Sequence, residues 1–473
     1  MDHQTSEWDN LSGIDVLRFA DNAGVANVGN AARVANAGGA YYAHIDNDFV
    51  SQTDAGNRLT VVNNDGTLNW NTESDLVLDL RGLSQSKWVT FVGANGVGNA
   101  GISSNRIVVD DISANQNQIL DGGDTDVRTT AAGGNTGNNN VYEVRNTANV
   151  SINDLAQVRN FGLINFTNDQ AVAQTLTLTL NNTVVENLVD TSNTAVSAAT
   201  NEVLRVVATD QGGGVASVLN IDARQVTGFH ALNVTGSAVG NDVLTLNSNV
   251  GGSTTAGDLG LVSQGDRVNW TGGSVSMNVT IDLGADGNAG GVAAGNGFAR
   301  FVDAAVTTTH DIDNVDIVDL TGLIYATSVI RGTAAAKTVI AGSGADTLSF
   351  AVGQAGTYVF TDVVADFNVT NTDTFTGNFD VIQGFSSGTD KLDLPAGVFS
   401  FIGNAYVTSG LGGTYYNPIP THVFFVRGDY VGSVFTVNTL AGRDTLVFYD
   451  VAGTNEAIVL AGITNFVPGT DLI

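Results

Sequence analysis

Apolar and polar residues alternate over short stretches along the chain, which is the period of a β-strand with one buried face. Leu76-Val-Leu-Asp-Leu80, Leu176-Thr-Leu-Thr-Leu180 and Val203-Leu-Arg-Val-Val207 carry apolar residues at alternate positions. Apolar spacings of three and four, which mark an amphipathic helix, are hard to find. The pattern therefore predicts a chain that is mostly β-strand.

A loose repeat joins such strands to turns. In it a glycine or asparagine is followed by apolar residues at the second, fifth and seventh positions, and it begins at Gly13, Asn160, Gly228 and Asn314. Each match indicates a turn and then a strand that adds one wall of a coil. With 57 glycines and only 4 prolines, the sequence favours many short strands joined by tight turns. We expect an all-β fold: a right-handed parallel β-helix or β-roll solenoid with a compact C-terminal β-domain.

The composition changes near residue 340. Thirteen of the 21 phenylalanines and all 4 prolines follow that point. Large rings fill a wider core than Val and Ala do, so this part is expected to have its own packing. The predicted division is a β-solenoid repeat region at residues 1–330, expected to be part of a longer array, and a C-terminal domain at residues 331–473.

The charge is strongly acidic, with a net value of −29. Aspartate supplies 41 of the 47 acidic residues; it favours turns and is a good ligand for hard cations. Two compatible interpretations stay open, solvated turn residues and calcium ligands. Without a basic face the chain is a poor partner for nucleic acid. The absence of cysteine excludes disulfides and thiolate metal sites, and no apolar run is long enough to predict a membrane span.

Acidic turns are the candidate calcium sites. The stretches 121–126 and 282–287 each bring several oxygen atoms within a short span. A Gly-x-Asp-x-apolar pattern recurs elsewhere, for example at residues 344–348 and 388–392. We therefore expect Ca²⁺ as cofactor, with ligands from Asp121, Asp124, Asp126, Asp282, Asp286, Gly342, Gly344, Asp346, Gly388 and Asp390.

Two consecutive nine-residue units occupy residues 332–340 and 341–349. The second, Ala341-Gly-Ser-Gly-Ala-Asp-Thr-Leu-Ser349, resembles the calcium-binding repeat of RTX proteins, which bacteria export by type I secretion. In that repeat the small residues allow a tight turn and the aspartate binds Ca²⁺. The first unit has Lys337 at the aspartate position. We expect the Lys337 ammonium to contact Asp346 in place of a cation.

The segment Asp380-Val-Ile-Gln-Gly-Phe-Ser-Ser-Gly-Thr-Asp-Lys-Leu-Asp-Leu394 resembles the one that closes the RTX repeats in the C-terminal domain of serralysin proteases. Here Val381, Ile382 and Phe385 are expected to be apolar anchors, and residues 388–390 a turn. The resemblance covers residues 330–473, whose acidic-then-apolar end is similar to the secretion signals of that family. It implies export as an unfolded chain, folding outside the cell with calcium, and a secreted or cell-surface location.

Enzyme motifs are absent from the sequence. There is no His-Glu-x-x-His, Gly-x-Ser-x-Gly or P-loop, and the five histidines are far apart. The earlier part of the chain resembles S-layer proteins and large adhesins in the spacing of its apolar residues, more than in any fixed motif. We therefore expect a non-enzymatic structural protein that assembles with itself into an S-layer, sheath, filament or biofilm matrix. One alternative is a calcium-dependent adhesin for cell-surface polysaccharide. The other is a polysaccharide-active β-helix enzyme, a lyase or epimerase, whose site is assembled only in space.

Overall fold

The computed structural model describes residues 2–3, 12–19, 41–63, 76–93, 96–97, 105–110, 118–123, 125–126, 140–146, 149–168, 170, 172, 174–189, 202–210, 218–228, 230–236, 241–248, 253–256, 266–283, 297–303, 306–312, 315–331, 338–342, 344–349, 357–359, 367–371, 374–377, 379–394, 423–451 and 454–473. Strands dominate these residues, and many of the strand pairs are parallel, which confirms the predicted all-β class. The chain forms two compact units, Met1–Leu244 with Val250–Val262 and Thr245–Asn249 with Ser263–Ile473.

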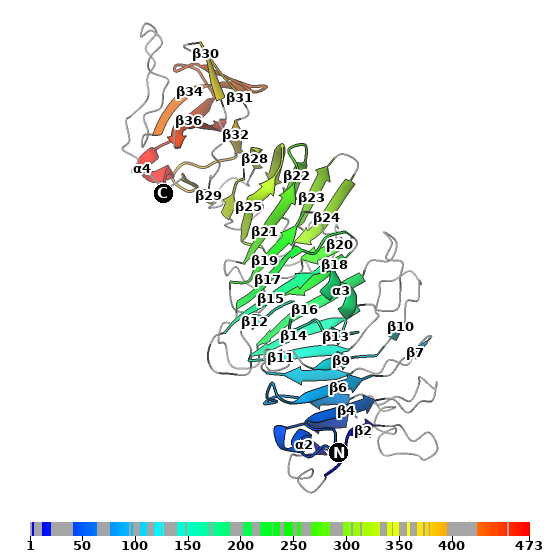
Figure 1. The fold of residues 1–473 in the computed structure, drawn as a ribbon. Coiled ribbons are helices and arrows are strands. Elements are labelled where there is room, and N and C mark those ends of the chain that lie inside the picture. The colour runs from blue at the N-terminus through cyan, green and yellow to red at the C-terminus, as the bar shows by residue number, and fades with distance from the viewer. Residues whose placement is uncertain are drawn as a thin grey trace, which may run out of the picture. The chain divides into compact units, whose positions relative to one another are not determined.

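The first unit contains a long parallel sheet (Figure 1). Its strands, in spatial order, are β1 (Asp2–His3), β3 (Tyr41–His44), β5 (Leu76–Asp79), β8 (Arg106–Val109), β11 (Val141–Arg145), β14 (Leu163–Asn168), β16 (Glu202–Asp210), β18 (His230–Thr235) and β20 (Ser253–Ala256). Strands that pair are separated in the sequence by residues that cross to another sheet. This is the connection that parallel strands require.

Two further parallel sheets of this unit receive the intervening strands. One consists of β2 (Val16–Phe19), β4 (Arg58–Asn63), β6 (Trp88–Val92), β9 (Ile119–Asp121) and β13 (Val158–Arg159). The other consists of β12 (Asn149–Val150), β15 (Thr175–Asn181) and β17 (Val218–Gln225). The short strands β7 (Gly96–Val97) and β10 (Thr125–Asp126) pair with each other. Strand β19 (Val243–Asn247) leads from the first unit into the second.

A continuous row of apolar side chains fills the interior behind the long sheet. Strand register aligns Ala43, Leu78, Ile107, Tyr142, Ile164, Val206 and Val234, and all of them are buried. Residues on either side of each row member point to the opposite face, because successive side chains of a strand alternate. The alternating apolar pattern therefore sets which face of each strand is internal.

The predicted turns precede strands as expected. Gly13, Asn160 and Gly228 have φ angles of 72°, 60° and 77°, in the left-handed region that glycine and asparagine tolerate best. The fourth predicted turn residue, Asn314, lies outside the described residues. The Gly/Asn position of the loose repeat thus marks a backbone requirement at the three turns that are described.

Among the described residues of the first unit, two short helices interrupt the strands. Helix α2 (Asn47–Ser51) follows Asp46, whose side chain accepts the Phe49 N–H at 2.9 Å. Helix α3 (Asn182–Val189) buries Val184, Val185 and Leu188, and the Asn181 side chain accepts the Val184 N–H at 2.8 Å. Both caps satisfy a backbone donor that has no partner within its helix. Among the described residues, no helix has the length and apolar character needed to span a membrane.

The second unit also contains two parallel sheets. One is β21 (Arg267–Gly273), β25 (Ile317–Ile324), β27 (Thr338–Ile340), β29 (Thr357–Val359) and β33 (Lys391–Asp393). The other is β22 (Asn278–Asp282), β26 (Thr327–Arg331), β28 (Ala345–Ser349), β32 (Asp380–Gln383) and β37 (Thr454–Ala461). Their parallel pairing continues past residue 330, and the domain boundary predicted there stays a prediction.

Antiparallel strands complete this unit. Strands β23 (Phe298–Asp303) and β24 (Val306–Ile312) form a hairpin next to β22. Nearer the C-terminus, β30 (Phe367–Asn371), β31 (Thr374–Gly377), β34 (Val423–Val431), β35 (Val434–Val437) and β36 (Asp444–Val451) pair antiparallel with one another and with β37. Phe375, Phe379, Phe435 and Phe448 are buried in one cluster between these strands. Phenylalanines that follow residue 340 therefore do pack together in an aromatic core.

The segment that resembles the serralysin closing motif has the predicted local structure. Val381, Ile382 and Phe385 are buried, and Gly388 lies in a turn with a φ of 84°. The last residues pack against this segment: helix α4 (Pro468–Asp471) leads to Ile473, whose N–H donates to the Leu392 carbonyl in β33 at 3.0 Å.

Candidate functional site

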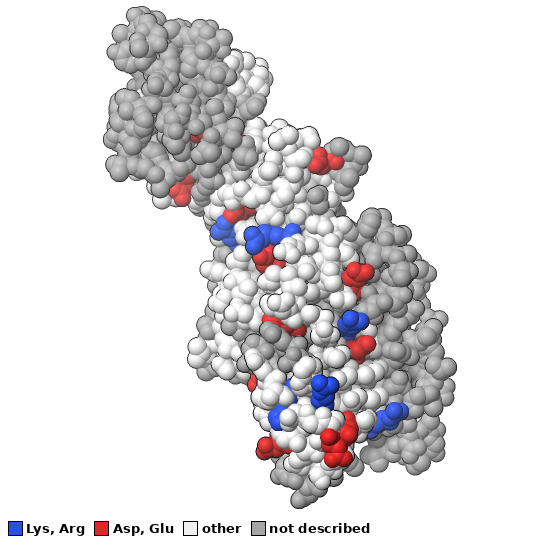
Figure 2. Space-filling model, in the orientation of Figure 1, with Lys and Arg blue, Asp and Glu red and all other residues white. Residues whose placement is uncertain are grey.

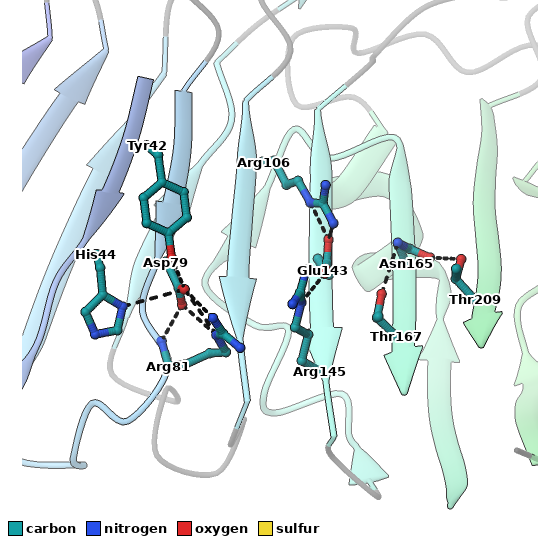
Figure 3. A network of polar contacts seen from close by, with 10 residues as sticks. All are labelled: Tyr42, His44, Asp79, Arg81, Arg106, Glu143, Arg145, Asn165, Thr167 and Thr209. Atoms are coloured by element: carbon teal, nitrogen blue, oxygen red, sulfur yellow. Dashed lines mark hydrogen bonds and ion pairs between the residues drawn. The ribbon is translucent and has the colours of Figure 1, made fainter. Parts of the chain in front are cut away.

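The outer side of the long sheet in the first unit carries a network of charged and polar side chains (Figure 3). Register aligns His44, Asp79, Val108, Glu143 and Asn165 across β3, β5, β8, β11 and β14. Although this row faces outward, Asp79 is 1% exposed and Glu143 is 0% exposed. Burying a carboxylate is unfavourable unless it is paired. The partners of these two acids therefore define the site.

Asp79 is surrounded by donors from the turn that follows its own strand and from β3. Arg81 donates from Nε to Oδ1 at 2.9 Å and from Nη2 to Oδ2 at 2.7 Å, which is a two-point contact. The Tyr42 hydroxyl donates to Oδ2 at 2.6 Å, and His44 Nδ1 lies 3.6 Å from the same oxygen. Figure 3 shows the three side chains converging on this one carboxylate.

The electrostatics of this cluster favour an ionised Asp79 and a protonated Tyr42. Burial alone raises the pKa of Asp79, but hydrogen bonds from Arg81 and Tyr42 outweigh it and bring that pKa below its ordinary value. Burial and the hydrogen bond to Asp79 raise the pKa of Tyr42 to about 12. The phenol therefore stays protonated at neutral pH. It suits the role of hydrogen-bond donor and not that of a general base.

Glu143 is held by two arginines. Arg106, from the preceding strand of the sheet, donates to Oε2, and Arg145, two residues further along β11, donates to Oε1. The arginines are 37% and 21% exposed, whereas their shared carboxylate is fully buried. Two guanidiniums on one carboxylate leave an excess positive charge at the surface of a chain that is otherwise strongly acidic.

The network continues onto the next strands through neutral groups. Asn165 Nδ2 donates to Thr167 Oγ1 at 3.3 Å, and Thr209 Oγ1 donates to Asn165 Oδ1 at 3.0 Å. These contacts connect β14 with β16. The amide and hydroxyl groups thus extend a polar stripe beyond the arginines (Figure 3).

These residues were not among the sequence-based candidates, but a local signal marks them. An acid, an apolar residue and an arginine follow one another at residues 79–81, 143–145 and 222–224. The middle residues Leu80, Val144 and Ala223 are buried, so the acid and the arginine share the outer face and form an ion pair. On the face in Figure 2, basic side chains accordingly lie beside acidic ones.

The predicted acidic turns are only partly described. Asp121 ends β9, and its Oδ1 accepts from Asn160 Nδ2 at 2.6 Å and from the Gly123 N–H at 3.0 Å. Asp282 ends β22. Asp126 is described by its backbone alone, and Asp124 and Asp286 lie outside the described residues. In the part of the chain that the structure describes, no three His, Asp or Glu side chains gather as a metal-binding group. Calcium binding stays a prediction.

Asp346, the aspartate of the RTX-like unit, lies inside the second unit. It is 0% exposed, and it accepts hydrogen bonds from the Tyr325 hydroxyl at 2.8 and 2.9 Å and from the Ser328 hydroxyl. Its own N–H donates to Asp380 Oδ1 at 2.8 Å, so register and hydrogen bonding bring two carboxylates together. Its predicted partner Lys337 lies outside the described residues.

The two glycines of that unit have a packing role. A Cβ at Gly344 would lie 2.4 Å from the Tyr325 ring, and one at Gly342 would lie 2.5 Å from the Leu320 carbonyl and 2.8 Å from the ring. The Gly342 N–H also donates to the Tyr325 hydroxyl at 2.9 Å. These positions need glycine because an aromatic ring and a backbone carbonyl approach the chain closely. The spacing of the motif therefore has a structural explanation whether or not metal binds.

Gly388 and Asp390 belong to the turn on which the chain's last residues dock. Asp390 is buried and accepts the Ser386 N–H at 2.6 Å. The Gly388 N–H donates to Asp471 Oδ1 at 2.6 Å. The structure thus brings Gly388 and Asp390 together in one hydrogen-bonded turn, at a distance in sequence from the other candidates.

Comparison with known proteins adds no relative. The chain matches no protein-family model, and none of the curated proteins matches it.

Proposed function

We propose that this chain is an extracellular structural protein whose parallel strands wind into a right-handed β-helix or β-roll solenoid. The antiparallel strands with the phenylalanine cluster form its compact C-terminal β-domain. The observation that carries the proposal is the row of buried apolar residues from Ala43 to Val234, which runs through successive parallel strands. In such a fold each layer contacts only its neighbours, so the architecture suits long, repetitive assemblies.

The proposed role is self-assembly into an S-layer, sheath, filament or matrix, with Ca²⁺ at acidic turns and further copies of the chain as partners. Two features of the sequence support it. The net charge of −29 opposes association of copies unless cations neutralise it. The motifs at residues 341–349 and 380–394 resemble those of RTX proteins, which fold outside the cell with calcium.

Assembly of the purified full-length chain tests this proposal. We expect sheets or filaments in electron micrographs, and a rise in light scattering, when millimolar Ca²⁺ is added. The melting temperature should also rise, because a ligand that binds only the native state stabilises it. A chain that stays monomeric and melts at the same temperature with calcium and with chelator contradicts the proposal.

A second candidate function, an adhesin for polysaccharide, is favoured by a separate observation. The arginines around Glu143 are partly exposed while the carboxylate that orients them is buried. Such an arrangement presents positioned cationic donors to a ligand. A monomeric chain that binds a glycan in the presence of calcium would support this function over self-assembly.

A further inference from the structure

The sheet formed by β2, β4, β6, β9 and β13 exposes apolar side chains on its outer side, which we call the apolar face (Figure 1). Four large apolar residues on it are between 36% and 53% exposed: Val16, Trp88, Val92 and Ile119. The other side of the same strands belongs to the core and buries Leu59, Val61, Val89, Phe91 and Leu120. The exposed residues are therefore not needed to fill the interior.

Strand register brings the exposed residues together. Val16, Thr60, Thr90 and Ile119 occupy one row across β2, β4, β6 and β9. Residues two apart in a strand share a face, so Trp88 and Val92 lie on either side of Thr90 along β6. Neighbouring positions of such a surface are about 5–7 Å apart. The exposed apolar groups thus form one patch, and a contiguous patch of this kind marks an interaction surface.

Two exposed arginines border the patch. Arg58 is the register partner of Trp88, and its guanidinium lies 5.0 Å from the centre of the indole ring. Arg159 lies on β13, at the edge of the sheet. Among the described residues, no carboxylate forms an ion pair with either arginine, and Asp121 beside Arg159 accepts hydrogen bonds from two neutral donors instead. Both guanidiniums are therefore available to carboxylates of another molecule.

The composition of the chain indicates what supplies those carboxylates. Acidic residues outnumber basic ones by 47 to 18, so a second copy of the chain presents many more carboxylates than guanidiniums. Two apolar faces placed against each other would offer arginines to arginines, whereas an acid-rich surface of a second copy complements them. Such a contact joins two different surfaces. It does not stop at two copies, because each added copy still has an apolar face or an acid-rich surface to offer.

We infer that the apolar face binds an acid-rich surface of a second copy of this chain in a head-to-tail contact. Trp88 and Ile119 supply apolar contact area, and Arg58 and Arg159 pair with carboxylates of the second copy. This inference rests on the self-assembly proposed above and names one of its two contact surfaces.

Charge reversal on the apolar face tests the inference in the full-length chain. Arg58→Glu with Arg159→Glu should raise the concentration needed for assembly in millimolar Ca²⁺ at least about tenfold, measured by light scattering. Arg224→Glu with Arg443→Glu changes the net charge by the same amount at two arginines that lie elsewhere and are 57% and 81% exposed. We expect this control to change the concentration less than about twofold. Equal effects of the two double variants would mean general repulsion and would contradict the inference.

The apolar part of the contact has its own variant. Ile119→Ser removes exposed apolar area and adds no charge, and it should raise the concentration needed for assembly about fivefold or more. The melting temperature of each variant, measured below that concentration, should stay close to that of the unchanged chain, because the altered side chains are exposed. Normal assembly of the Ile119→Ser chain would contradict an apolar contact at this face.

Mixing the chains distinguishes a head-to-tail contact from a symmetric one. The Arg58→Glu, Arg159→Glu chain keeps its acid-rich surface, so it can join a free apolar face but offers none to the next copy. One such chain in about ten should shorten the assemblies seen in electron micrographs several-fold. Unchanged lengths would overturn the head-to-tail contact. If the unchanged chain does not assemble with calcium, the proposed function fails as well; if it assembles and the face variants assemble equally well, this inference alone fails.

Discussion

Two buried carboxylates, one in each unit, are held by different kinds of hydrogen-bond donor. In the first unit Glu143 accepts from the guanidiniums of Arg106 and Arg145 on the outer side of a sheet. In the second unit Asp346 accepts from the hydroxyls of Tyr325 and Ser328 inside the fold. An ion pair on an outer face leaves cationic groups available to a ligand, whereas hydroxyl donors in the interior do not. The comparison separates a surface suited to binding from an internal contact suited to stability.

The largest effect is expected from removing both arginines of the outer cluster. Arg106→Ala with Arg145→Ala leaves the buried Glu143 without its two guanidiniums, and an orphaned buried charge destabilises a protein by about 3–5 kcal/mol. Hydrogen exchange should then accelerate in residues 105–110 and 140–146. Adding Glu143→Gln should restore part of the stability, because the charge is gone. If the variant that also carries Glu143→Gln is no more stable than the double arginine variant, the arginines do not act by balancing the charge of Glu143.

A smaller effect is expected from the hydroxyl donor of the inner carboxylate. Tyr325→Phe keeps the ring under Gly344 but removes two contacts to Asp346, which retains Ser328 as a donor, and it removes the hydroxyl that accepts the buried Gly342 N–H. The expected cost is about 1–3 kcal/mol. Tyr42→Phe is the matched change in the outer network, where Arg81 still holds Asp79, and it should cost less than about 1 kcal/mol. Urea denaturation measures both. Equal losses would remove the distinction between the two regions.

The acid limb of the stability profile should report on Asp79. Its pKa is lower in the folded state than in the unfolded chain, so its contribution is present above the unfolded pKa of about 3.9 and is lost as pH falls through the folded pKa. Asp79→Asn should therefore flatten the loss of stability below about pH 4. Denaturant midpoints measured across this pH range check the effect. An unchanged acid limb would show that the guanidinium of Arg81 does not favour the ionised form.

The smallest effect is expected for an exposed ion pair of the same sequence type. Asp222 and Arg224 form a contact of 2.6 Å at the surface, and exposed pairs contribute less than about 1 kcal/mol. Arg224→Ala should leave the melting temperature nearly unchanged. A loss comparable to that of the Arg106 and Arg145 double variant would mean that burial of the acid is not the deciding variable.

Some of the fold follows from the sequence because local rules determine it. The alternation in Leu76–Leu80 places Leu76, Leu78 and Leu80 inside, and a left-handed backbone is found at Gly13, Asn160 and Gly228. Side-chain period and backbone sterics act within a few residues, so they are visible without a structure.

The outer network could not be predicted in the same way. Tyr42 and Asp79 are 37 residues apart, and so are Arg106 and Glu143; they meet only because neighbouring strands adopt one register. The acid–apolar–arginine triplets were visible in the sequence, but which acid becomes buried depends on the strands on either side. The RTX-like motif gave the position of Asp346, but nothing local predicted that Tyr325 would donate to it.

Because neighbouring strands repeat the same apolar–polar alternation, they could also pair in a shifted register. The outer network disfavours one such shift. A slip of β11 by two residues against β8 would keep apolar residues facing the interior, because side chains alternate with a period of two. The buried row therefore does not distinguish the native alignment from the slipped one. In one direction that slip would bring Glu143 opposite Asp110 in place of Val108, and two carboxylates would face each other. The charged outer row therefore disfavours this one slip, which the buried row alone would allow.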